Sequence, residues 1–270
     1  MSTRTRARKA PWKRALVTGS SAGIGTALAR DLAGRGVDLV LVARNGERLE
    51  KLAAELRGAH RVEVEVLPAD LSDATSRDQV VQRLAAEPAI DLLVNNAGIG
   101  TFGALANLDI EGELGLIEVN VVAPVVLTKA AIDRMKTAGH GSVLTISSLD
   151  GLQPTPNHAS YGASKAFVNS FFEAVHQELR GSGVTVTTVM PGYVPTEFTQ
   201  RAGIENALEG VPRFMILDPA RVARDSVDGA AAGKAKVVPG AIYQVSAVAL
   251  GATPTAIGRR IFARLAPPVD

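Results

Sequence analysis

The stretch VTGSSAGIG, residues 17–25, determines how the rest of the sequence is interpreted. Its glycines, Gly19, Gly23 and Gly25, follow an apolar run of strand length and precede an apolar pattern typical of a helix. Glycine lets the backbone turn tightly and approach a ligand, and a helix N-terminus offers unpaired N–H groups to an anion. Glycines also mark ordinary turns, but a first strand–turn–helix unit with this spacing predicts a dinucleotide diphosphate site.

Apolar, β-branched runs of strand length recur along the chain, each closed by Gly, Pro, Asp, Asn or Ser, or by the Arg that ends the second run. They lie at 14–19, 37–44, 62–70, 91–98, 141–148 and 184–192. Helical patterns lie between them, at 24–34, 47–57, 73–86, 108–137 and 159–180. Strands this apolar are typical of a parallel sheet that is covered on both faces. The sequence therefore predicts a doubly wound α/β (Rossmann) fold with about seven strands.

The composition of the 270-residue chain excludes several classes of protein. With 46% hydrophobic and 21% charged residues it is typical of a globular protein. Cysteine is absent, which excludes disulfides and thiol nucleophiles and suits a reducing cytoplasm, where we expect the protein to be located. Four scattered histidines form no metal-ligand motif, so we expect no metal site.

We divide the chain into a basic tail at 1–13, one catalytic domain at 14–240, and a helical extension at 241–270. The first fourteen residues hold six basic side chains and no acid, which leaves the rest of the chain net negative. We interpret the tail as a frayed terminus and expect no nucleic-acid partner. Because no uninterrupted apolar run approaches 18 residues, we expect no stable membrane insertion. For residues 240–260 we favour packing, with a lid, an oligomer interface or a membrane-surface contact as alternatives.

The second strand ends in VAR, with Ala43 and Arg44, where an NAD site usually carries an acid. A carboxylate there would repel a 2′-phosphate, whereas the Arg44 guanidinium can pair with it. The sequence therefore favours NADP over NAD, with a solvated loop residue as the other interpretation of Arg44.

The segment SSLDGLQPTPNHASYGASK, residues 147–165, brings three reactive side chains together. Tyr161 and Lys165 share a face of a predicted helix, four residues apart. A phenol has a pKa of about 10, and we expect the ammonium to lower that value until Tyr161 can exchange protons. Ser148 ends the fifth strand, where doubly wound sheets bind ligands, and its hydroxyl can hydrogen-bond a substrate oxygen.

These motifs together resemble the short-chain dehydrogenase/reductase family over about residues 13–240. TGSSAGIG matches its glycine motif, NNAG (95–98) its fourth-strand motif, and Ser148, Tyr161 and Lys165 its active site. Asn120 and the segment PGYVPTEF (191–198) match further family positions. The family's second basic position, inside the glycine loop, is occupied here by Ser21 or Ala22, which departs from the NADP-preferring pattern.

The resemblance implies a role for each matching residue. Tyr161 is the general acid in reduction and the base in oxidation, Lys165 lowers its pKa and holds the nicotinamide ribose, Ser148 orients the substrate oxygen, and Asn120 positions a water. The cofactor would be NADP(H), with NAD as the alternative, and we expect its binding residues to be Gly19, Ser21, Gly23, Ile24, Gly25, Arg44, Asp70, Leu71, Asn96, Ala97, Gly98, Tyr161, Lys165, Pro191, Gly192, Val194 and Thr196. Family members usually assemble, so a homodimer or homotetramer is expected.

Residues 193–216 follow the last motif and carry Phe198, Phe214 and Met215. Long loops beside a cofactor are common substrate lids, and the apolar residues indicate a lipophilic ketone, steroid-like molecule or acyl derivative. We therefore expect an oxidoreductase that interconverts a carbonyl and a secondary alcohol. The alternatives are a weakly catalytic NADP-binding sensor or scaffold, and a nucleic-acid-binding protein that uses the basic tail.

Overall fold

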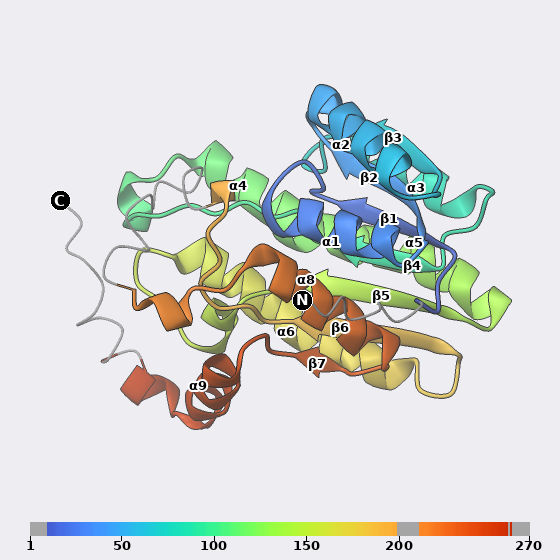
Figure 1. Cartoon of the computed structure of the whole chain (residues 1–270). Helices are drawn as coiled ribbons and strands as arrows, with labels where there is room; N and C mark the ends of the chain where they lie inside the picture. Colours follow the sequence, from blue (N-terminus) through green and yellow to red (C-terminus); the bar gives the residue numbers. More distant parts are fainter. Residues whose placement is uncertain (1–9, 199–210, 259, 261–270) are drawn as a thin grey trace.

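The structure is a computed structural model, which describes residues 10–198, 211–258 and 260. Its centre is a seven-stranded, wholly parallel sheet with the order β3-β2-β1-β4-β5-β6-β7 (Figure 1). The strands are β1 (Arg14–Thr18), β2 (Asp38–Ala43), β3 (Val64–Pro68), β4 (Leu92–Asn95), β5 (Gly141–Ile146), β6 (Val184–Val189) and β7 (Lys236–Val237). The predicted doubly wound fold is confirmed, and the predicted strand ranges contain β1 to β6.

Helices cover both faces of the sheet. They are α1 (Gly23–Gly34), α2 (Gly46–Ala59), α3 (Ala74–Ala85), α4 (Ile110–Ile117), α5 (Ala123–Ala138), α6 (Ala159–Glu178), α8 (Pro219–Ala231) and α9 (Ala241–Ala252). Short turns of helix are η1 (Leu105–Asn107), η2 (Glu118–Val122), η3 (Leu149–Leu152) and η5 (Arg213–Met215).

The strands distribute their side chains to two hydrophobic cores because successive residues of a strand point to opposite faces. Leu39 and Leu41 of β2 pack with α1, α2 and α8, whereas Val40 and Val42 pack with α3, α5 and α6. All four side chains are fully buried. Burial on both faces explains why the strands are apolar throughout and not alternating.

The direction in which successive strands are added to the sheet reverses between β1 and β4. The chain builds β1, β2 and β3 outward to one edge and then returns to lay β4 on the other side of β1. Ligands of doubly wound sheets bind at such a switch point, outside the carboxyl ends of the strands. The carboxyl ends of β1 and β4 are Thr18 and Asn95, so the glycine turn and the NNAG motif meet there.

The predicted helix at 108–137 is three segments, because the π-helical turn η2 separates α4 from α5. By length and composition alone, the stretch Ile110–Ala138 could cross a membrane, although charged residues interrupt it near both ends. This is weak evidence, because buried helices of folded proteins meet the same criteria. Here α5 packs against α3 and β5, and η2 packs against α6.

Candidate active site

The glycine turn between β1 and α1 is held by close backbone contacts. Gly19 has a φ of +65°, and a Cβ on it would lie 2.8 Å from the Ala97 Cα. A Cβ on Gly25 would lie 2.2 Å from the Gly19 carbonyl oxygen. Only glycine fits such approaches without a shift of the backbone. The turn therefore packs the start of α1 directly onto the ends of β1 and β4.

Polar side chains from β1 and β4 lock this turn. Thr18 Oγ1 accepts hydrogen bonds from the Asn96 and Ala97 N–H groups at 2.9 and 3.0 Å, and it donates to the Val94 carbonyl at 3.1 Å. Asn96 Nδ2 donates to the Thr18 and Gly19 carbonyls at 2.9 and 3.2 Å. Asn96 and Ala97 therefore shape the turn, and their predicted contact with a cofactor stays a prediction.

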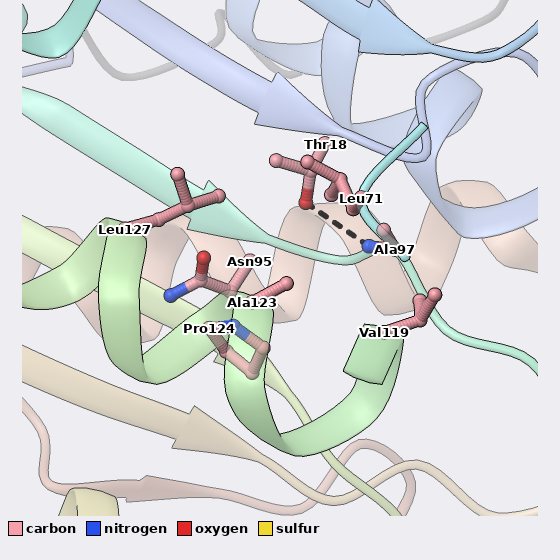
Figure 2. Close-up of a pocket in the computed structure, with 8 residues that line it drawn as sticks. All are labelled: Thr18, Leu71, Asn95, Ala97, Val119, Ala123, Pro124 and Leu127. Atoms are coloured by element: carbon pink, nitrogen blue, oxygen red, sulfur yellow. Dashed lines mark hydrogen bonds between the residues drawn. The ribbon is translucent and has the colours of Figure 1, made fainter. Parts of the chain in front are cut away.

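A cavity of about 10 Å³ lies beneath the switch point (Figure 2). Leu71 and Ala97 form part of its wall, opposite the α5 side chains Ala123 and Leu127. Asn95 also lines it, and its Oδ1 is buried without a hydrogen-bond partner. This cavity is too small for a nicotinamide ring. Leu71 therefore lines an internal cavity that lies next to the expected cofactor site.

A groove of about 650 Å³ adjoins the glycine turn on the side of α1 and α8. Ser21 and Gly23 line it together with Glu197 and Asp218. Its volume is within the range of ligand pockets. It does not include the Ser148, Tyr161 or Lys165 side chains, so the groove borders the diphosphate end of the expected site and not the catalytic end.

Arg44 and Asp70 follow β2 and β3 at the same edge of the sheet. Arg44 Nη1 lies 3.9 Å from Asp70 Oδ2, and the Arg44 side chain is 67% exposed. Ser72 donates to Asp70 Oδ1 through its N–H at 2.9 Å and its hydroxyl at 2.7 Å. Burial raises the pKa of Asp70, but the hydrogen bonds from Ser72 and the charge of Arg44 outweigh it, so the pKa is lowered. Asp70 is therefore held as a carboxylate, and Arg44 is accessible to a ligand.

Ser148, Tyr161 and Lys165 converge at the carboxyl end of β5. Ser148 is the N-cap residue of η3, which packs against α6, and its Oγ accepts from the Asp150 N–H at 3.1 Å. Tyr161 and Lys165 are only 9% and 6% exposed, one turn apart on α6. Lys165 Nζ lies 5.6 Å from the centre of the Tyr161 ring and donates to the Ile146 carbonyl at 3.2 Å. The structure thus brings the three predicted side chains together.

The pKa values of this pair are set mainly by burial. Burial raises the pKa of Tyr161 well above its ordinary value, the Asp150 carboxylate raises it further, and a hydrogen bond with Ser148 opposes both. Burial lowers the pKa of Lys165 to about 8, against a smaller upward effect of Asp150. The prediction that Lys165 lowers the pKa of Tyr161 is wrong for this structure. Burial, and not the charge of the neighbouring ammonium, dominates the pKa of Tyr161.

Asn120 lies in the π-helical turn η2 and is 2% exposed. Its Oδ1 accepts from the Ile99 N–H at 3.0 Å, and its Nδ2 donates to the Ile99 carbonyl at 2.9 Å and to Ser164 Oγ at 3.1 Å. A Cβ on Gly98 would lie 3.4 Å from Asn120 Oδ1 and 3.6 Å from Lys165 Nζ. Asn120 therefore ties the loop after β4 to α6 beside Lys165. Single π-turns inside helices are frequent at functional sites.

The segment after β6 reaches back over the glycine turn. The Pro191 carbonyl accepts from the Leu149 N–H at 3.4 Å, and Val194 packs in a small cluster with Ile24. A Cβ on Gly23 would lie 2.9 Å from Thr196 Cγ2, so Thr196 lies directly against the turn. Of the predicted lid at 193–216, residues 199–210 lie outside the described residues.

Sequence reasoning missed the contact made by Tyr243 of α9. A Cβ on Gly192 would lie 2.1 Å from the Tyr243 ring, so the ring requires glycine at that position. The Tyr243 hydroxyl accepts from the Tyr193 N–H at 3.1 Å and donates to the Met215 carbonyl at 2.5 Å. Tyr243 therefore joins the two described ends of the predicted lid, a contact that no local pattern around residue 243 indicates.

Two aromatic rings lie close to the Tyr161 ring, and a third packs against one of them. The Phe198 ring lies 5.4 Å from the Tyr161 ring, and His158 lies 5.8 Å from it and 5.1 Å from Phe102, centre to centre. His158 Nδ1 is 3.5 Å from Asp150 Oδ2. Asp150 is the second residue that sequence reasoning missed, because its effect on Tyr161 acts through space and not through a motif.

The chain's own geometry fits a dinucleotide phosphate. The N-cap residue of α1, Ala22, offers no side-chain hydrogen bond to the first helical N–H groups, so these donors are not used by a cap. Gly19 and Gly23 both adopt positive φ, which glycine reaches without strain, and as glycines they place no side chain in the turn. In the part of the chain that the structure describes, no group of three or more His, Cys, Asp or Glu residues could hold a metal ion.

Comparison with known proteins agrees with this geometry. The sequence profile of the family described as short chain dehydrogenase matches residues 13–207. An uncharacterized oxidoreductase of Myxococcus xanthus is 38% identical over 70% of this chain and 74% of its own length. The very-long-chain 3-oxoacyl-CoA reductase of Anas platyrhynchos is 35% identical over 69% of this chain and 61% of its own length.

Solved structures show the same relationship. The short-chain dehydrogenase from Sphingobium yanoikuyae in complex with NADPH superposes with a TM-score of 0.82 and 32% identity, over 96% of this chain and 98% of its own. Other structures of this fold contain NADP or NADH. The chain belongs to the short-chain dehydrogenase/reductase family. It is an NAD(P)-dependent oxidoreductase that acts on CH–OH donors.

Proposed function

We propose that the protein reversibly reduces the carbonyl group of a lipophilic substrate to a secondary alcohol, with NADPH as the preferred cofactor. The observation that carries this proposal is the convergence of Ser148, Tyr161 and Lys165 within a wall of aromatic rings. When bound, NADP(H) supplies or accepts the hydride.

Tyr161 donates the proton that the substrate oxygen takes up during reduction, and it accepts that proton during oxidation. Its raised pKa keeps the phenol protonated at neutral pH, which is the form that reduction needs. The Ser148 hydroxyl, hydrogen-bonded to Tyr161, orients the same substrate oxygen and stabilises charge that develops on it.

Lys165 and Asn120 complete the proton path. With a pKa lowered to about 8, Lys165 exchanges a proton near neutral pH more readily than an ordinary lysine. Asn120 lies beside it across Gly98 and is held by three hydrogen bonds. In this proposal Asn120 positions a water that returns a proton to Lys165.

The cofactor preference and the substrate class rest on separate residues. Arg44 is exposed at the end of β2 and can pair with a 2′-phosphate. The nearby Arg48, on the first turn of α2, is instead paired with Glu197 at 2.8 Å. Phe102 and Phe198 near Tyr161 favour an apolar substrate. The relative from Anas platyrhynchos reduces very-long-chain 3-oxoacyl-CoA, which agrees with this class.

An NADPH-oxidation assay with a series of methyl ketones of increasing chain length tests this proposal. We expect kcat/KM to rise with chain length, because each further CH₂ that is buried contributes about 0.8 kcal/mol. A protein that binds NADPH but reduces no member of the series would instead be a cofactor-binding sensor. A preference for short, polar ketones would refute the lipophilic substrate class and leave the reaction type in place.

A further inference from the structure

The helix α9 differs from the other surface helices in its lack of charge. From Val237 to Gly258 the sequence contains no charged residue. Helices at the surface of a soluble protein usually place charged and polar residues on the side that faces water. The outward side of α9 instead carries Ala241, Val245, Val248 and Ala252, spaced four, three and four residues apart and all exposed. We call these four residues the α9 face.

The α9 face presents large apolar side chains to the surroundings. Val248 and Val245 are 73% and 71% exposed, the two highest fractions among the large hydrophobic residues that the structure describes. Ile257, shortly after the helix, is 51% exposed. Val245 and Val248 lie three residues apart on one helix, and neighbouring exposed apolar side chains are typical of surfaces that meet another apolar phase.

Three polar side chains of α9 each donate a hydrogen bond within the protein. Gln244 Nε2 donates to the Val238 carbonyl at 3.1 Å, and Ser246 Oγ donates to the Ile242 carbonyl at 3.0 Å. The Tyr243 hydroxyl donates to the Met215 carbonyl. A polar group that already has a protein partner loses little when water is removed. These three donors therefore stay paired when water is removed from the outward side of the helix.

The charged residues next to α9 along the sequence have one sign. No acidic residue lies between Asp228 and Asp270, whereas this stretch contains five basic residues, Lys234, Lys236, Arg259, Arg260 and Arg264. Lys234 and Lys236 precede the helix, Arg260 follows it, and all three are exposed. Lys236 Nζ pairs with Glu173 of α6 at 2.7 Å, so Lys234 and Arg260 carry the charge argument. A second copy of the chain on the α9 face would bring like charges together, whereas an anionic lipid surface complements them.

The helix is attached to the loop that carries the catalytic serine. Gln153, directly after η3, donates through Nε2 to the Leu250 and Thr253 carbonyls at 2.8 and 2.9 Å. Figure 1 shows α9 at the edge of the molecule, beyond β7 and away from the sheet. Through Gln153 and Tyr243, α9 is therefore joined to both segments that border the site around Tyr161.

We propose that the α9 face rests in the interface of a membrane that contains anionic lipids, with the flanking basic residues among the headgroups. The 12 residues of α9 form a helix about 18 Å long, too short to cross a hydrocarbon core of about 30 Å, so α9 lies on the membrane and does not span it. This inference rests on the proposed function only in one respect: a lipophilic substrate would then enter the site from the lipid.

Co-sedimentation of the full-length protein with vesicles tests the inference. One set of vesicles is phosphatidylcholine, and the other contains phosphatidylglycerol at roughly one third of the lipid, which provides an anionic surface. We expect at least about tenfold more bound protein on the anionic vesicles at low salt, and a decrease as salt is added. The double variant Val245→Asp/Val248→Asp should lose this binding.

The matched control is Leu114→Asp on α4, which changes an apolar side chain that is 55% exposed away from α9. It should bind vesicles like the unchanged protein. Arg260→Gln should reduce the ratio of binding to anionic vesicles over phosphatidylcholine vesicles. Its binding to each kind of vesicle should be weaker than that of the wild-type protein. NADPH titration of every variant verifies that the fold is intact.

Three results would overturn the inference. The first is that the wild-type protein does not co-sediment with vesicles, and the second is that the double variant still binds them. The third is that the wild-type protein is an oligomer, the double variant is a monomer, and neither binds vesicles. The last result would assign the α9 face to a second copy of the chain. Failure of the proposed function would appear separately, as absence of NADPH-dependent ketone reduction in solution without vesicles.

Discussion

The helices α6 and α9 depart from ordinary amphipathic patterning in opposite directions. α6 buries polar side chains, including Tyr161, Ser164, Lys165 and Asn169, whereas α9 exposes Val245 and Val248. Folded proteins usually break such local rules where function requires it. The inward polar face of α6 meets reacting groups, and the outward apolar face of α9 meets a second phase. The comparison therefore assigns the reaction chemistry to the inward face of α6 and the contact with the surroundings to the outward face of α9.

The largest expected effect comes from the inward face of α6. Tyr161→Phe removes the proton donor but keeps the ring against Phe198, so kcat for ketone reduction should fall by about 10³-fold or more. NADPH affinity should stay within about threefold of wild type, because the phenol acts on the substrate oxygen. Steady-state kinetics and calorimetry measure both quantities. Tyr193→Phe, at an exposed tyrosine near the site, is the control, and equal activity of Tyr161→Phe and wild type would refute the mechanism.

The same substitution on each helix sharpens the comparison. Val168 of α6 is 1% exposed and Val248 of α9 is 73% exposed. Val168→Asp buries an unpaired carboxyl group and should cost more than about 4 kcal/mol of unfolding free energy or prevent folding. Val248→Asp should change it by less than about 0.5 kcal/mol. Urea unfolding compares them. A large loss in Val248→Asp would show that α9 packs against the protein itself.

Lys165→Met should lower the activity and raise the unfolding free energy at neutral pH. The folded-state pKa of Lys165, about 8, lies below the unfolded value of about 10.4, so the native state carries a cost at pH values below 8. Wild-type stability should therefore rise between about pH 8 and 10 through this residue, and the variant should lack that rise. At pH 7 the variant should be about 1–3 kcal/mol more stable and at least about 10²-fold less active. Thermal unfolding across pH measures the first effect, and a destabilised variant at pH 7 would contradict it.

Asp150→Asn should produce the smallest effect, on the pH dependence. The Asp150 carboxylate raises the pKa values of both Tyr161 and Lys165, so its neutralisation should lower them. The alkaline limb of the kcat profile for reduction should move down by about half a unit to one unit. An unchanged or upward-shifted limb would show that Asp150 does not act on the pair.

The main features of the fold could be predicted because they depend on local patterns. The six longer strands are apolar runs between turn residues, and the glycine turn requires glycine for contacts such as that of Gly25 with the Gly19 carbonyl. The seventh strand was not located in sequence because β7 is only two residues long. Ser148, Tyr161 and Lys165 could be found because they lie at fixed spacings from one strand end.

Features that depend on contacts across the fold could not be predicted. The direction of the Tyr161 pKa depends on how deeply α6 is buried and on Asp150, neither of which is visible in the spacing of Tyr161 and Lys165. Tyr243 reaches Tyr193 and Met215 from a helix that carries no family motif. Such contacts follow from packing, which a single sequence does not reveal.

Parallel calorimetric titration of the purified protein with NADPH and with NADH tests most directly whether this chain is an NADP(H)-dependent oxidoreductase. We expect NADPH to bind at least about tenfold more tightly, a difference of about 1.4 kcal/mol, because Arg44 pairs with the 2′-phosphate. Arg44→Ser should remove that difference, whereas Lys51→Ser on the neighbouring helix should keep it. Tighter binding of NADH would refute the role of Arg44, and binding of neither cofactor would contradict the oxidoreductase function itself.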